Sequence, residues 1–436
     1  MTRQRLWATS RAQWSWALAD WAREPFFSIV LSLIFPPFFV SAVVADPIRG
    51  TVLWGYGISI ASAALVFLSP LAGAAADSTG RRKPWIVASM AGVAGGMTSL
   101  WWATSEPGHF IWVLASVAGT QLAVELSRIF SDSMVLRVTN KEGVGRLSGL
   151  SVSLGFLASL IYLGGVLVAA RTGVSADEVS TTVQRIASVL CGLWLVVFML
   201  PLLLYCPDYP AEARSWLETS HESWRRLRNS LRDVVRIPGV GRFLLARMAY
   251  WDGMMGLFSF IAILASSRLQ WRAAEISIFG LLGLLVSSGS ALVAGSLDRR
   301  YGSKRVLAVG IGLMLFVASL MLLIMPTGET LAAASALFGS VHDRMFLALA
   351  VIASGCVGII LASSRTMMVS LSPPDRLGEF FGLYVMVGRA SSFAAPLLVA
   401  TTTALLDDQT AGVFGVSIIF LLLGLLLLAR VPTHHR

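Results

Sequence analysis

The chain has 436 residues, of which 56% are hydrophobic and 13% are charged, with a formal net charge of +10. Soluble globular chains carry about 25% charged residues, so that class is excluded. An outer-membrane barrel is excluded too, because its strands would alternate apolar and polar residues. The composition predicts an all-α polytopic membrane protein, in which each apolar run of about 20 residues crosses the bilayer.

Twelve membrane-spanning helices are predicted, and short loops join most of them. Their expected ranges are 14–43, 51–76, 85–104, 110–136, 147–170, 184–205, 242–265, 274–297, 306–325, 345–369, 379–404 and 411–430. About two thirds of the 34 Lys and Arg residues fall in the two tails and in the loops after even-numbered spans. By the positive-inside rule this places both termini in the cytoplasm, so the basic charge reports topology and indicates no nucleic-acid partner. Lys is scarce beside Arg, which is typical of a GC-rich bacterial genome. A multi-pass helical protein of a bacterium is expected in the cell inner membrane.

The first span carries three ionisable residues, Asp20, Arg23 and Glu24. Asp20 and Glu24 are four residues apart and share a helix face, and Arg23 lies beside them. An ionised group at membrane depth is costly unless it is paired or hydrated. Pro36 and Pro37 interrupt the same span, and Pro396 interrupts the eleventh. Such breaks are tolerated only where protein or a polar cavity satisfies the freed carbonyl group.

The loop after the second span, GAAADSTGRRKP, contains a pattern formed by Gly73, Asp77, Gly80, Arg81 and Arg82. Gly73 would let a neighbouring helix pack closely, and Asp77 places a carboxylate at a helix end, where it can pair. Gly80 permits a sharp turn, and the basic residues hold the loop in the cytoplasm. An ordinary positive-inside loop is the alternative. The spacing also resembles the signature loop between helices 2 and 3 of the major facilitator superfamily of transporters, which implies a gating role for these residues.

Charged residues recur in the fourth and seventh spans. Glu125, Arg128 and Asp132 are three and four residues apart, so they form a single stripe on one helix face. For Glu125 and Arg128, a role in solute binding and mutual neutralisation remain equally open. Arg247 and Asp252 lie in the seventh span. Asp252 falls near mid-membrane with no partner on its own helix face, which favours a functional role.

A long cytoplasmic segment, 206–241, divides the chain into two halves of six helices, 1–205 and 242–436. Arginines in this segment are interleaved with Trp, Leu and Val at near-helical spacing, which predicts an amphipathic helix on the membrane surface. Its functional interpretation is binding to anionic lipid headgroups. The alternative is a plain tether between the halves.

The second half contains a weaker copy of the gating-loop pattern, GSLDRRYGSKR, at 295–305. Here Asp298 stands four residues before Gly302, one more than in the first loop, so Asp298 is a weaker candidate for the same pairing. Two related loops half a chain apart indicate two pseudo-symmetric halves, as in many secondary transporters. Arg365 and Glu379 lie near the cytoplasmic ends of the tenth and eleventh spans and are predicted to pair at a gate or loop.

The charged residues within the spans lead to the hypothesis of a polar central cavity between the two halves. Its arginines would bind a carboxylate or another anion: Arg23, Arg128 and Arg389. One or more acids would exchange protons, because a carboxyl group keeps its proton more readily when it is removed from water. The candidate acids are Asp20, Glu24, Glu125 and Asp252. Asp132 completes the candidate set. Alternatively, these charges neutralise one another and hold the helices in register.

Four stretches narrow the family resemblance. They are WALADWAREPFF at 16–27, RIFSDSMVLRVTNKEGVGRLSGL at 128–150, RFLLARMAYWDGMMGLF at 242–258 and LGEFFGLYVMVGRASSFAAPL at 377–397. Together they resemble the vacuolar effluxer-like branch of the superfamily, which includes autophagy-linked amino-acid effluxers and bacterial members. The resemblance implies solute export or uptake driven by an ion gradient, and it supplies no substrate.

Three positions depart from that branch. Arg23-Glu24 stands where relatives commonly have a neutral Asn-Ser pair, Asp132 replaces an Asn, and Leu136 replaces a Pro. The added charge beside the expected cavity disfavours a neutral amino acid and favours a charged solute.

The leading functional hypothesis is a secondary active transporter of a small polar or anionic solute, of the amino-acid or organic-anion class. It would work by alternating access, as an efflux or symport protein coupled to protons or another ion. An ATP-driven pump is excluded because the chain has no G-x4-G-K-[ST] loop, and no cofactor or metal is expected. A sensor or scaffold without flux and a membrane-embedded enzyme are the alternatives. A monomer is expected, and the substrate, the direction of transport and the coupling ion stay open.

Overall fold

The computed structural model describes residues 10–103, 108–139, 144–172, 176–210, 225, 239–325, 337–372, 384, 386–388 and 391–432. Throughout these residues the secondary structure is helical, which confirms the all-α membrane class. Ten helices in this part of the chain are long and apolar enough to cross a membrane. The predicted surface helix of the linker lies almost wholly outside the described residues.

The N-terminal half contains α1 (Arg11–Pro25), η1 (Phe26–Leu33), α2 (Phe35–Phe38), η2 (Phe39–Val44), α3 (Pro47–Thr79), α4 (Lys83–Ser99), η3 (Leu100–Trp102), α5 (His109–Ser133), α6 (Val135–Val138), α7 (Val144–Thr172) and α8 (Ala176–Tyr205). The C-terminal half contains α10 (Val240–Arg268), α11 (Ala273–Tyr301), α12 (Ser303–Ile324), α13 (Val341–Leu371), α15 (Ala394–Leu406), η5 (Ala411–Gly415) and α16 (Val416–Ala429).

Two of the twelve predicted spans are shorter than expected among the described residues. The span predicted at 85–104 is the 17-residue helix α4, which tightens into the 3-10 turn η3. Of the span predicted at 379–404, the described continuous helix is α15, with 13 residues. Pro396 therefore lies in the first turn of α15, where a missing N–H costs little, and a turn at 391–393 precedes the helix.

The first span stays helical from Arg11 to Val44 in spite of its prolines. The short helix α2, which contains Pro36 and Pro37, is flanked by the π-helical segments η1 and η2. This confirms an interruption at the two prolines, because a ring without an N–H breaks the regular hydrogen-bond ladder. The hydroxyl of Ser32 donates to the Phe27 carbonyl at 2.9 Å and satisfies one acceptor in η1.

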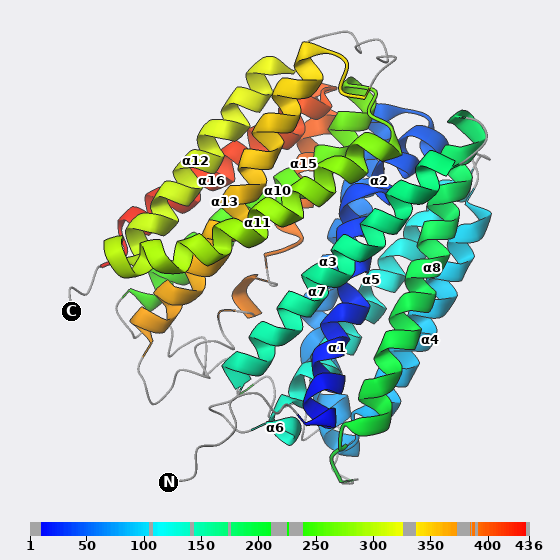
Figure 1. The fold of residues 1–436 in the computed structure, drawn as a ribbon, viewed down its shortest axis with the longest axis vertical. Coiled ribbons are helices and arrows are strands. Elements are labelled where there is room, and N and C mark those ends of the chain that lie inside the picture. Colours follow the sequence, from blue (N-terminus) through cyan, green and yellow to red (C-terminus); the bar gives the residue numbers. More distant parts are fainter. Residues whose placement is uncertain are drawn as a thin grey trace.

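The two halves form separate bundles that converge at one end of the molecule and diverge at the other (Figure 1). Across the two halves α3 packs against α15, and α7 packs against α11. One hydrophobic cluster draws on both halves, with Trp54 and Phe260 among its members, whereas a second cluster consists of residues from the C-terminal half alone. At the convergent end Gln409 donates to the Thr51 hydroxyl at 2.6 Å and accepts from Ser267 at 2.9 Å. The halves are therefore joined mainly at this end.

A valine at Gly55 is expected to separate the halves at the convergent end. A Cβ atom at Gly55 would lie 2.8 Å from both the Ala400 Cβ and the Pro396 carbonyl oxygen, so the side chain needs backbone movement. Spin labels at the exposed positions Arg49 and Ala404 report the distance between the two halves by double electron–electron resonance. We expect a longer distance in Gly55→Val.

Gly57→Val is the matched control. A Cβ there would meet the far end of the Leu114 side chain at 2.9 Å, within the same half, and a flexible side chain can move aside. The label distance should match that of the wild type in this control. An unchanged distance in Gly55→Val would contradict the close approach of the two halves.

Candidate functional site

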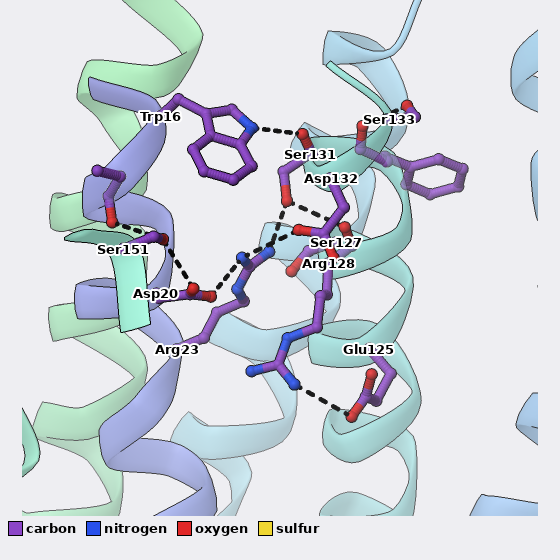
Figure 2. A network of polar contacts seen from close by, with 12 residues as sticks. Trp16, Asp20, Arg23, Glu125, Ser127, Arg128, Ser131, Asp132, Ser133 and Ser151 are labelled. Atoms are coloured by element: carbon purple, nitrogen blue, oxygen red, sulfur yellow. Dashed lines mark hydrogen bonds and ion pairs between the residues drawn. The ribbon is translucent and has the colours of Figure 1, made fainter. Parts of the chain in front are cut away.

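The first group of charged residues lies where α1 packs beside α5 (Figure 2). Ser10 and Gln13 form a capping box that starts α1. One turn later the Trp16 indole donates to the Ser131 carbonyl oxygen at 2.8 Å and fixes α1 against the end of α5. Arg23 lies roughly 18 Å along the helix from the first residue of α1, at about 1.5 Å per residue.

Arg23 is surrounded by acceptors. Its side chain is 1% exposed, and its Nη2 atom lies 2.9 Å from the Asp20 carboxylate and 3.8 Å from that of Asp132. Its Nη1 atom donates to the Ser131 hydroxyl at 2.6 Å. Asp20 is itself held by the Ser151 hydroxyl of α7 at 2.7 Å. These contacts favour a structural role for Arg23, joining three helices.

Arg128 makes looser contacts than Arg23. Its guanidinium lies 3.7 Å from Glu24 and 3.9 Å from Glu125, both beyond ordinary hydrogen-bond distance, and its side chain is 22% exposed. The guanidinium also lies over the Phe27 ring, 4.7 Å from its centre. Because these contacts are long and water reaches the side chain, Arg128 can change partners at low cost. It is the better candidate for contact with an anion.

The network has more acids than bases. Four carboxylates (Asp20, Glu24, Glu125 and Asp132) surround two guanidinium groups, those of Arg23 and Arg128. With every group ionised the network would carry excess negative charge at membrane depth, which is costly.

Replacing Arg23 by Gln is expected to destabilise the protein strongly. Removing one member of a buried ion pair leaves an uncompensated charge and costs about 3–5 kcal/mol, and Arg23 is buried against Asp20. The thermal unfolding midpoint in detergent should fall by several degrees. The double variant Asp20→Asn/Arg23→Gln should recover part of the loss, because the stranded carboxylate is gone. Equal midpoints for wild type and Arg23→Gln would contradict a structural role.

The second group lies in the C-terminal half on α10. Asp252 is 2% exposed and accepts a hydrogen bond from the Ser391 hydroxyl at 3.1 Å. It also lies roughly 18 Å from the first residue of its helix, at about 1.5 Å per residue, which is the same distance along the helix as for Arg23 in α1. Ser391 belongs to the turn before α15, and the Phe393 carbonyl in that turn accepts from Ser59 of the other half at 3.1 Å. Asp252 therefore faces a break in the eleventh span, close to the contact between halves.

Arg247 lies one and a half turns before Asp252, and sequence reasoning gave it no role. It is 5% exposed, with its guanidinium carbon 3.7 Å from the centre of the Tyr384 ring and 4.8 Å from that of Trp251. Its Nε and Nη1 atoms have no hydrogen-bond partner among the described residues. Burying an ion costs several kcal/mol, whereas a desolvated cation–π contact returns about 2 kcal/mol. The aromatic rings alone do not offset the burial of this charge.

The structure bears differently on the predictions made for the two gating loops. Gly80 has a left-handed backbone conformation with a φ of 71°, which confirms the predicted turn there. Gly302 also has a positive φ, of 86°, with a ψ of 139°. A Cβ at Gly73 would meet nothing within 4 Å among the described residues, so the close helix contact expected there stays a prediction. Asp298 is buried and accepts from the Ser363 hydroxyl at 2.7 Å. Arg365 is exposed on α13.

Several predicted site groups lie outside the described part of the chain. They are the residues Arg389 and Glu379 and the side chains of Asp77 and Leu136. Their roles stay predictions. No group of three or more His, Cys, Asp or Glu residues within the described ranges could hold a metal ion.

Sequence reasoning missed the partner of the first gating loop, which is Asp208. Its carboxylate accepts from the backbone N–H groups of Arg82 at 2.9 Å and of Lys83 at 3.2 Å, and so caps the start of α4. Arg82 also donates to the Ser133 hydroxyl at 3.2 Å and stacks on Tyr209 at 5.1 Å. An acid in the proline-flanked stretch after the sixth span was the available signal, but spacing alone does not connect it to a loop more than a hundred residues earlier.

Comparison with known proteins gives consistent findings. The family model described as "Vacuole effluxer Atg22 like" matches residues 43–436. The uncharacterized MFS-type transporter YxiO of Bacillus subtilis is 24% identical over 424 residues, covering 96% of this chain and 94% of the relative. Autophagy-related protein 22 of Cryptococcus neoformans is 23% identical over 447 residues, covering 96% of this chain and 76% of the relative. A crystal structure of a D-xylose–proton symporter has the same fold, with a TM-score of 0.71 at 12% identity over 97% of this chain and 98% of that one.

Proposed function

The chain belongs to the Atg22-like vacuole effluxer family and is an MFS-type transporter rather than an enzyme, and from this premise we propose that it moves a small anionic solute together with protons. The solute class is an amino acid or an organic anion. Transport proceeds by alternating access between the two halves, as in transporters built from structural repeats.

One observation supports this proposal most. Charged groups occur at the same distance from the start of the first helix of each half, with Arg23 in α1 and Asp252 in α10, although each charge buried in a membrane is costly. Asp252 adjoins the turn at 391–393, and discontinuous helices near the contact between repeats are where transporters bind solutes and ions.

The proposed roles follow from how each group is held. Arg128 binds the solute anion, because its carboxylate partners lie at 3.7 Å and 3.9 Å and can be exchanged for another. Asp252 carries the coupling proton. Ser391 is its hydrogen-bond donor, and Arg247 is the charged residue whose field reaches it. Arg23 is the structural member that keeps α1, α5 and α7 together.

The two gating loops stabilise one end state of the cycle. The positive charge of these loops supports a cytoplasmic position for them and for both termini. The proposed location is the inner membrane. The two bundles diverge at the end of the molecule that carries these loops (Figure 1). The two units that move against each other are the halves 1–205 and 242–436. The linker between them, 206–241, contacts anionic lipid. The protein acts as a monomer.

Flux measurements in proteoliposomes test the proposal. Purified protein is reconstituted, a pH gradient is imposed, and uptake of radiolabelled amino acids, organic anions, sugars and neutral polar solutes is compared. We expect accumulation of a carboxylate-bearing solute that collapses when a protonophore removes the gradient. Absence of flux for every solute under any gradient, together with retained ligand binding, would contradict transport and favour a sensor.

A further inference from the structure

The buried guanidinium of Arg247 has features of a ligand-binding group that the contacts around it leave incomplete. The guanidinium lies over the rings of Tyr384 and Trp251, whereas its Nε and Nη1 atoms have no acceptor among the described residues. Such donors are normally satisfied when they are buried. Stacking on rings leaves the edge of a guanidinium, where its N–H groups point, available to a carboxylate.

The surroundings hold this side chain in place. Tyr384 is fixed by a chain of hydroxyl groups, in which Ser364 Oγ lies 2.8 Å from Tyr384 Oη and 2.6 Å from Tyr250 Oη. On another side Gly388 leaves room for the guanidinium, because a Cβ there would lie 2.7 Å from Arg247 Nη1. A cation held this rigidly pays little conformational entropy when a ligand binds.

Among the described residues, no carboxylate lies within ion-pair distance of the Arg247 guanidinium, although Asp252 is on the same helix. Asp252 is instead engaged with Ser391. Arg247 lies roughly 10 Å from the start of α10 and Arg128 roughly 8 Å from the end of α5, at about 1.5 Å per residue, so the two arginines of opposite halves lie at similar distances from a helix end.

We propose that Arg247, which stacks on Tyr384 and Trp251, is the carboxylate-binding residue of the C-terminal half and receives the solute's anionic group opposite Arg128. This inference rests on the proposed function, because it gives the anionic solute a contact in each half. The solute class it selects is a small carboxylate, in preference to a sugar or a neutral amide.

The first arm of the test needs no ligand. Thermal unfolding of the full-length protein in detergent is compared for wild type, Arg247→Met and Arg268→Met. Arg268 is the matched control on the same helix, because its guanidinium pairs with Asp408 at 3.2 Å. A buried charge without a partner destabilises the ligand-free protein, and an apolar replacement is neutral or stabilising. We expect an unchanged or higher midpoint for Arg247→Met and a lower one for Arg268→Met.

The second arm uses matched probes: succinate and succinamide, benzoate and benzamide, leucine and leucinamide. Ligands raise the midpoint by mass action, so wild type should respond to carboxylates and not to their amides. Arg247→Met should bind carboxylates about 100-fold more weakly, as is typical for loss of a buried charged contact. Gly388→Ala keeps the charge but displaces the guanidinium, and should weaken binding of the same probes.

The outcomes separate this inference from the proposed function. A midpoint that falls in Arg247→Met as far as in Arg268→Met, or equal carboxylate responses in wild type and Arg247→Met, would overturn the assignment while leaving transport intact. If no probe binds or moves in the wild type, the proposed function fails. In that case a raised midpoint in ligand-free Arg247→Met would still support an anion-binding role for Arg247.

Discussion

Asp252→Asn is expected to abolish gradient-driven accumulation of the solute while leaving solute–solute exchange nearly intact. Asparagine keeps the shape of the side chain and can still accept the hydrogen bond from Ser391, which spans 3.1 Å in the wild type. It cannot take up or release a proton. Accumulation and counterflow exchange in proteoliposomes measure the two activities separately, and the pH dependence of uptake should disappear in the variant.

Asp343→Asn is the matched control for this prediction. Asp343 is another buried aspartate of the C-terminal half, and its hydrogen bonds run to the Trp271 indole at 3.0 Å and the Ser340 N–H at 3.0 Å. These are structural partners at the start of α13, so the control should retain accumulation. If Asp252→Asn accumulates solute with the same pH dependence as the wild type, Asp252 does not carry the proton.

Arg128→Gln is expected to raise the half-saturating solute concentration about 100-fold, the usual effect of truncating one partner of a charged contact. The unfolding midpoint should fall much less than in Arg23→Gln. Arg128 is 22% exposed with long ion pairs, whereas Arg23 is 1% exposed with an ion pair of 2.9 Å. Uptake kinetics and thermal unfolding, measured on the same preparations, separate loss of binding from loss of fold.

Comparing Arg128→Gln with Arg23→Gln tests whether the two arginines have different roles. If Arg128→Gln lost stability to the same extent as Arg23→Gln and retained normal solute affinity, both residues would be structural. The charges of α1 and α5 would then serve only to hold the helices in register.

The sequence predicted the fold class and most of the spans because burial in a bilayer imposes long apolar runs that are visible without any structure. It also predicted the charged stripe of Glu125, Arg128 and Asp132, since neighbours on one helix follow from spacing. The short helix α4 was not predicted, because hydropathy does not register where a helix tightens into a 3-10 turn. In the eleventh span Pro396 predicted an interruption, and the turn at 391–393 lies just before that proline.

Partners on different helices were beyond reach of spacing rules. The sequence placed Arg23 and Arg128 in one class, and the distances to their acids distinguish them. It gave Asp252 no partner on its own face, and the structure supplies Ser391 from another element. The stacking of Arg247 on Tyr384, which is 137 residues later in the chain, depends on how α10 and the eleventh span pack, and no local pattern indicates it.

The most direct test of the account records proton and solute movement together in proteoliposomes that contain the wild-type protein. With the membrane potential clamped and no pH gradient imposed, a carboxylate solute is allowed to flow down its own gradient while the external pH is followed. The account predicts that protons move with the solute in the wild type and stop moving in Asp252→Asn, in which solute exchange continues. Solute flux without any accompanying proton movement in the wild type would contradict it.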